Sequence, residues 1–141
     1  MIKPKNRQVE FAHFNYQKAL IEKYFPCFVC TLRNNNLRCT GYITPSEGFE
    51  TYTLQIDYKN GSTPKVKVLS PNVAYDHNAH MYKDSSLCLF HPKETPWRKI
   101  YNIHETIIPW IAEWLVFYEL YKIYGVWIGP EAEHGEIEAE K

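Results

Sequence analysis

A cysteine with histidines on either side of it is the residue of this chain best suited to chemistry. Cys88 lies in the stretch DSSLCLFHP, residues 84–92, after a polar turn and between two leucines. His80, Asp84 and His91 are near it in the sequence, and such groups can tune or assist a thiolate nucleophile. A cysteine between leucines is also a common packing residue. The residue types alone leave both interpretations open.

The same region offers a second kind of chemistry, because it holds four side chains that bind zinc. His77 and His80 are separated by two residues, and so are Cys88 and His91. Zinc takes such ligands in tetrahedral geometry. The spacing is loose, since histidine-rich loops produce it by chance, and no glycine stands between Cys88 and His91 to form a tight turn. A zinc site is therefore kept as an alternative.

Patterned segments before this region predict the elements that must position it. Apolar residues at helical spacing predict a helix over residues 7–24, which Pro26 ends. Alternating apolar and polar residues then predict four short strands, at 28–33, 37–44, 51–58 and 64–69. Turn residues separate the strands. We therefore expect a four-stranded antiparallel meander with one solvated face and one face packed on helices.

The first hairpin of this meander has a predicted register. A turn on Asn34-Asn35 sets Cys30 opposite Cys39, with both side chains on one face. Cys27, Cys30 and Cys39 lie in or beside apolar strands, so we interpret them as packing residues. The N-terminus does not resemble a signal peptide. We therefore expect a cytoplasmic protein whose four cysteines are thiols.

Residues 71–102 show no convincing period, and they contain the candidate chemistry. A structureless segment of this length inside a compact domain is usually functional. Within it, Trp97 is interpreted as a buried anchor that fixes the loop carrying Cys88.

A long helix follows the irregular segment, with apolar residues at Ile107, Ile111, Trp114, Leu115 and Tyr118. Its start has two interpretations. Asn102 and Glu105 can form a capping box, which would leave Pro109 inside the helix, or the helix can begin near Pro109. Residues 131–141 hold five Glu and one Lys and are expected to form a solvated, flexible tail.

Length and charge limit the classes of function. The 141 residues suit one domain, which we assign to residues 1–130. Sixteen Lys and Arg residues balance sixteen Asp and Glu residues, and zero net charge removes the attraction on which nucleic-acid binding depends. The most apolar segment, residues 107–118, is too short to span a bilayer. We expect neither nucleic acid nor membrane as a partner.

The order of these parts resembles the ubiquitin-conjugating enzyme (UBC) fold, over roughly residues 7–120. PKVKVLSP, residues 64–71, resembles the fourth strand of that family, and DSSLCL, residues 84–89, is similar to its active-site motif. Trp97 lies nine residues after Cys88, close to where the family keeps its Trp. The resemblance implies an α+β, UBC-like domain with an N-terminal helix, a four-stranded meander, an active-site loop and a long C-terminal crossover helix.

The sequence departs from the eukaryotic members of that family in three places. The His-Pro-Asn motif is missing and His80-Met81-Tyr82 takes its place, so the Asn that assists the transition state is absent. The approach to the fourth strand is shortened to KNGST, and the last two helices are replaced by YGVWIGPEAEH and the acidic tail. These features resemble the bacterial branch found in CBASS-like antiviral operons beside cyclic-oligonucleotide synthases.

The resemblance implies an enzyme, a thioester carrier whose nucleophile is Cys88. An activating enzyme would pass the C-terminus of a ubiquitin-like protein, or of a cyclic-oligonucleotide synthase, to this thiol, and an amine of a target protein would then attack it. His80 is implied as a donor to the oxyanion or as the proton acceptor, and Asp84 is a second candidate for deprotonating or orienting the attacking lysine. No cofactor or metal is expected. His77 and His91 are expected to be surface residues or residues that structure the loop.

Two other functions stay open. Some members of the fold lack the cysteine and only bind ubiquitin-like partners, and the missing Asn favours such a non-catalytic binding module. The presence of Cys88 at the active-site turn favours the enzyme. The zinc alternative would instead make His77, His80, Cys88 and His91 the ligands of a zinc-stabilised interaction domain.

Overall fold

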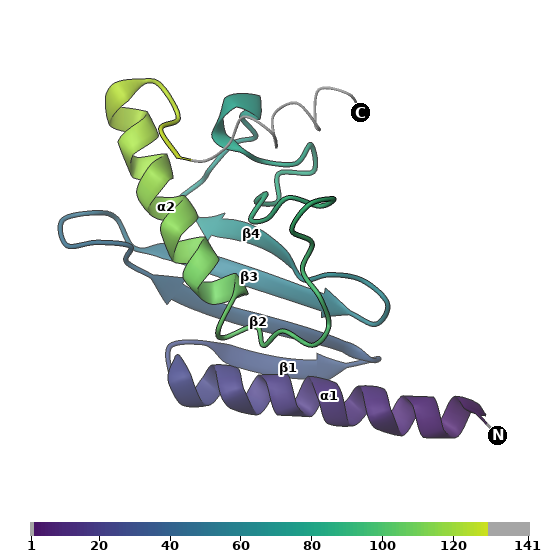
Figure 1. Ribbon diagram of the computed structural model, residues 1–141. Coiled ribbons are helices and arrows are strands. Elements are labelled where there is room, and N and C mark those ends of the chain that lie inside the picture. The colour runs from purple at the N-terminus through teal and green to yellow at the C-terminus, as the bar shows by residue number, and fades with distance from the viewer. Residues whose placement is uncertain (1, 130–141) are drawn as a thin grey trace.

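The computed structural model describes residues 2–129 of the chain, and the order of its elements is the predicted one (Figure 1). The elements are α1 (Ile2–Tyr24), β1 (Val29–Arg33), β2 (Asn36–Ile43), β3 (Tyr52–Lys59), β4 (Lys65–Ser70), the short 3-10 helix η1 (His77–Ala79) and α2 (Ile107–Tyr124). The α+β layout is thereby confirmed. The predicted tail, residues 131–141, and the domain boundary at residue 130 lie outside the described residues.

The sheet is an antiparallel meander in the order β1-β2-β3-β4. Its first hairpin has the predicted register, because Cys30 pairs with Cys39. Asn34 and Asn35 form the turn with φ angles of 52° and 62°. Two-residue hairpin turns need this left-handed conformation, which Asn tolerates better than most residues. The turn chemistry therefore sets the register of the hairpin.

The pairing of Cys30 with Cys39 changes the chemistry expected of the cysteines. The two sulfur atoms form a disulfide across the hairpin, and both residues are buried in the core. The expectation of four thiols is wrong for this pair. Directly opposite positions of an antiparallel pair bring side chains into contact, and the Cα atoms here are 4.0 Å apart. Cys27 and Cys88 lie outside the disulfide.

One face of the sheet carries the core. Alternate residues of β3, from Tyr52 to Tyr58, are buried, as the period-two pattern predicted. Figure 1 shows α2 crossing this face, where Ile111 and Leu115 are fully buried. α1 lies beside β1 and contributes Phe14 to the same core. The two helices and the sheet therefore form one framework, on which the loop between β4 and α2 is carried.

α2 begins at Ile107, between the two predicted starts. The side-chain amide of Asn102 does donate to the Glu105 carboxylate, at 2.9 Å, but residues 103–106 form turns and not a helix. Pro109 consequently lies in the first turn of α2, where its missing N–H costs no helical hydrogen bond. Neither α2 nor any other helix within residues 2–129 has the length and apolar character that crossing a membrane requires.

Candidate active site

The segment that carries Cys88 is fastened to the sheet beyond β4. The backbone N–H of Leu87 donates to the carbonyl of Val66 in β4 at 2.9 Å, and Leu87 also forms an isolated bridge with Met81. The N–H of Cys88 donates to the carbonyl of His80 at 3.0 Å. Residues 80–88 thus form a small hairpin on the edge of the sheet, in which Cys88 and His80 are neighbours.

A tight turn closes this hairpin and depends on Asp84. One carboxylate oxygen of Asp84 accepts hydrogen bonds from the N–H and the hydroxyl of Ser86, at 3.0 and 2.6 Å, and the other accepts one from Lys65 Nζ at 2.6 Å. Burial raises the pKa of Asp84, but the hydrogen bonds from Lys65 and Ser86 outweigh burial and hold this pKa well below its usual range. A carboxylate this weakly basic is suited to shaping the turn and poorly suited to accepting a proton at neutral pH.

Cys88 is buried without being part of the main core. The residue is 6% exposed, and its thiol Sγ lies 3.7 Å from the carbonyl oxygen of Phe90. The contiguous hydrophobic core includes the preceding Leu87 but not Cys88. Burial of this kind suits a packing cysteine as well as a thiol held within a site.

Contacts with both the backbone and the side chain fix the position of His80. It is 7% exposed, and its backbone is left-handed, with φ 56° and ψ 58°, which is uncommon for a residue other than glycine. Its carbonyl accepts the N–H of Cys88 and also the indole N–H of Trp114 in α2, at 3.1 Å. Its imidazole lies against the ring of Trp127, with the centroids 5.1 Å apart. The structure therefore brings both predicted catalytic residues together and ties them to α2.

The other two histidines of the loop have separate surroundings. Nδ1 of His91 accepts the backbone N–H groups of Lys93 and Glu94, at 3.2 and 2.9 Å, so His91 structures the turn that follows it, as predicted. His77 is exposed at the start of η1. In the part of the chain that the structure describes, no three His, Cys, Asp or Glu side chains are arranged to hold a metal ion.

Trp114 and Trp127 are the site residues that the sequence did not reveal. Helical periodicity assigned Trp114 to the core, but it could not show that the indole N–H reaches a carbonyl 34 residues earlier in the chain. Trp127 gave only a weak signal, as one aromatic residue in a short segment between Gly125 and Gly129. Both residues contact the loop from segments that are far away in the sequence. A local sequence pattern does not encode such contacts.

Trp97 anchors the C-terminal part of the loop, as predicted. Its side chain is 4% exposed, and its indole N–H donates to Oγ1 of Thr106 at 2.9 Å, just before α2. The indole also packs edge-on against the Tyr58 ring of β3, with the centroids 5.4 Å apart. These contacts fix the loop between the sheet and α2.

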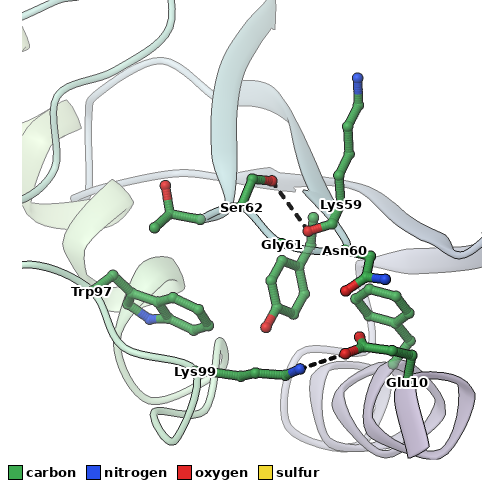
Figure 2. A pocket seen from close by; sticks show the side chains of 10 residues that line it. Glu10, Lys59, Asn60, Gly61, Ser62, Trp97 and Lys99 are labelled. Carbon is green, nitrogen blue, oxygen red and sulfur yellow. Dashed lines mark hydrogen bonds and ion pairs between the residues drawn. The ribbon is translucent and has the colours of Figure 1, made fainter. Parts of the chain in front are cut away.

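A hollow of about 280 Å³ lies on the α1 side of Trp97 (Figure 2). Glu10 and Lys99 form an ion pair at 2.6 Å on its wall. The Tyr58 hydroxyl, also on the wall, is 2.9 Å from Nε2 of His13, and burial together with Glu10 raises the pKa of Tyr58 to about 12. Neither predicted catalytic residue lines this hollow. The candidate active site is therefore a different part of the molecule.

One family of known proteins matches most of the chain. The family E2-CBASS, described as Type II CBASS E2 protein, matches residues 17–135, a span that includes Cys88, His80 and both tryptophans that contact His80. No curated protein sequence matches the chain significantly.

Proposed function

Because the chain belongs to the family of Type II CBASS E2 proteins, we propose that it is a ubiquitin-conjugating-like thioester carrier that works with other components of a CBASS antiphage operon. Cys88 would accept the C-terminus of a ubiquitin-like protein or of a cyclic-oligonucleotide synthase from an activating enzyme. It would then pass this acyl group to an amine of a target protein.

The hydrogen bond between the Cys88 N–H and the His80 carbonyl is the observation that carries this proposal. This backbone bond makes Cys88 and His80 neighbours within one short hairpin, and the left-handed backbone of His80 is the kind of local strain that often marks a functional site. A thiol also suits the chemistry, because a thioester is reactive enough to acylate an amine and persists long enough to be carried.

Transfer would proceed by attack of the amine nitrogen on the thioester carbonyl carbon. The new C–N bond forms, the C–S bond breaks, the thiolate of Cys88 leaves and the amine gives up a proton. His80 would either donate a hydrogen bond to the oxyanion that develops on the carbonyl oxygen or accept the proton of the amine. Asp84 would support the turn and would not take the proton, because Lys65 and Ser86 already hold its carboxylate.

The direct test is to load the protein with an acyl group. The full chain is incubated with a candidate activating enzyme, ATP and the ubiquitin-like or synthase partner, and the products are separated on a non-reducing gel. We expect an adduct that thiols remove and that Cys88→Ala abolishes. Cys27→Ala is the matched control, because Cys27 is the other cysteine outside the disulfide. The absence of an adduct with an activating enzyme that demonstrably adenylates the partner would overturn the proposal.

The burial of Cys88 favours a second candidate, a non-catalytic module that binds a ubiquitin-like partner. Such a module would form no adduct, and Cys88→Ala would bind the partner as tightly as the wild type does. A zinc-stabilised interaction domain would instead contain stoichiometric zinc that is lost in His77→Ala. Binding measurements and metal analysis on the same preparations therefore separate the three functions.

A further inference from the structure

The chain reverses direction after α2 and lays one aromatic side chain back on the helix. Gly125 ends α2 with a φ of 79°, and its N–H donates to a carbonyl in the last helical turn at 2.8 Å. We name residues 125–129 the return segment. Val126 and Ile128 are 60% and 53% exposed, whereas Trp127 between them is half-buried and packs against the core.

Trp127 lies in a cluster of rings that includes His80. Its ring centroid is 5.6 Å from that of Trp114 and 6.0 Å from that of Tyr121, both on α2. On the loop side it is 5.1 Å from the His80 imidazole, with 36° between the two planes. Trp114 in turn donates its indole N–H to the carbonyl of His80. The backbone of His80 is therefore held by α2, and its side chain is contacted by the return segment.

We propose that Trp127 is a positioning residue, which fixes the orientation of the His80 imidazole for transfer of the acyl group from Cys88. This inference rests on the proposed function. A side chain has several staggered rotamers, and an indole ring packed at a tilt against one side of the imidazole selects among them. Catalytic groups lose much of their effect when they are displaced by about 1 Å. Loss of the Trp127 ring should therefore slow transfer, whereas loading, which needs the thiol of Cys88, should be unchanged.

The test uses the full chain in a Cys27→Ala background and a defined acyl donor. A synthetic peptide that ends in a glycine thioester exchanges with Cys88 and loads it without an activating enzyme. Mass spectrometry then follows loading and the discharge of the acyl group to free lysine. Trp127→Leu removes the ring and keeps apolar bulk, Trp127→Phe keeps a ring, and Val126→Ala is the control within the return segment. Melting curves establish that the variants are folded.

A second readout reports the ring contact independently of any activity. The NMR signals of the His80 ring protons, assigned with His80→Ala, are shifted by the ring current of the adjacent indole. We expect Trp127→Leu to move these signals, to load at the wild-type rate and to discharge about tenfold more slowly. Trp127→Phe should recover most of the discharge rate, and Val126→Ala should match the wild type.

Two results overturn different claims. If Trp127→Leu discharges at the wild-type rate while His80→Ala discharges slowly, the positioning role is wrong and the proposed function stands. If the wild-type thioester discharges no faster than the same peptide on a simple thiol, the proposed function fails and the role of Trp127 fails with it.

Discussion

His80 and Asp84 are the two residues considered for assisting transfer from Cys88, and their surroundings assign them different tasks. The Asp84 carboxylate accepts hydrogen bonds from Ser86 and Lys65, and its pKa is held low, so it stays ionised and occupied. The imidazole of His80 lies against Trp127, in the hairpin that carries Cys88. The stronger candidate for assisting transfer is therefore His80.

His80→Ala should slow discharge of the loaded thioester about 100-fold, while loading changes by less than about twofold, since general acid–base assistance is typically worth this much. His80→Asn separates the two roles left open for this residue, because an amide can donate a hydrogen bond but cannot take up a proton. Recovery of the rate in His80→Asn would identify oxyanion stabilisation. If His80→Ala slows neither step, as measured by single-turnover gels, His80 has no role in transfer.

Asp84→Asn should affect the stability of the protein and not its transfer rate. Because the pKa of Asp84 is lowered on folding, its ionised form stabilises the fold. That stabilisation is complete above the pKa of an unfolded Asp, about 3.9, and is lost as the pH falls through the lower folded value. We expect the wild type to melt at a higher temperature than Asp84→Asn at pH 6, and the gap to begin to narrow as the pH falls below about 4. A large loss of discharge rate at pH 7 would contradict the structural role.

At the scale of elements, α2 is the part that holds the site together. Trp114 reaches the loop from the middle of the helix, and Thr106, just before the helix, holds Trp97 at the other end of the loop. The β4 strand supplies the third attachment, through the carbonyl of Val66. The loop, which has no periodic structure, is thereby attached to both α2 and β4.

Trp114→Phe should therefore weaken the whole domain as well as the site. The change removes the indole N–H that donates to the buried His80 carbonyl, which also accepts the Cys88 N–H, and it removes some packing, so we expect a loss of about 1–3 kcal/mol in the free energy of unfolding. Urea denaturation measures this loss. Trp110→Phe, on the same helix and half-buried against Phe90, is the control and should cost less.

The sequence was informative about the elements for reasons that are local. Alternation along β3 and the two Asn residues of the first turn express properties of neighbouring residues, and the structure confirms both. The start of α2 was left open because Asn102 and Glu105 do interact, but in a turn. The contacts of His80 with Trp114 and Trp127 join segments far apart in the chain, and no local pattern predicts them. The position of Cys88 in the loop between β4 and α2 was predictable, whereas the contacts of Trp114 and Trp127 with this loop were not.

At the scale of the whole molecule, the two cysteines of the first hairpin and the other two cysteines form separate chemical classes. The Cys30–Cys39 disulfide lies in the core between β1 and β2. Cys27 and Cys88 are outside it, at the edge of the first strand and in the loop. The domain therefore combines a covalent link within its sheet with two cysteines that lie outside that link.

Alkylation of the denatured protein should show this division. Without reductant, iodoacetamide should modify two cysteines, Cys27 and Cys88, and after reduction it should modify all four. Closing a short loop by a disulfide contributes on the order of 2 kcal/mol, so Cys30→Ala combined with Cys39→Ala should unfold at lower urea concentration. Four modified cysteines in the unreduced sample, counted by mass spectrometry, would show that the pair is reduced in the purified protein.

The burial of Cys88 also constrains the cargo that such a protein would accept. Cys88 is 6% exposed and its Sγ faces a carbonyl of its own loop, so a reactive group on a rigid, folded surface would not reach it. The incoming carbonyl would have to arrive at the end of a slender, extended chain with little bulk beside the reacting carbon, as glycine provides. The hairpin would then select cargo by the width of its C-terminal end. Slender ends would reach Cys88 and bulky ends would not, whatever sequence precedes them.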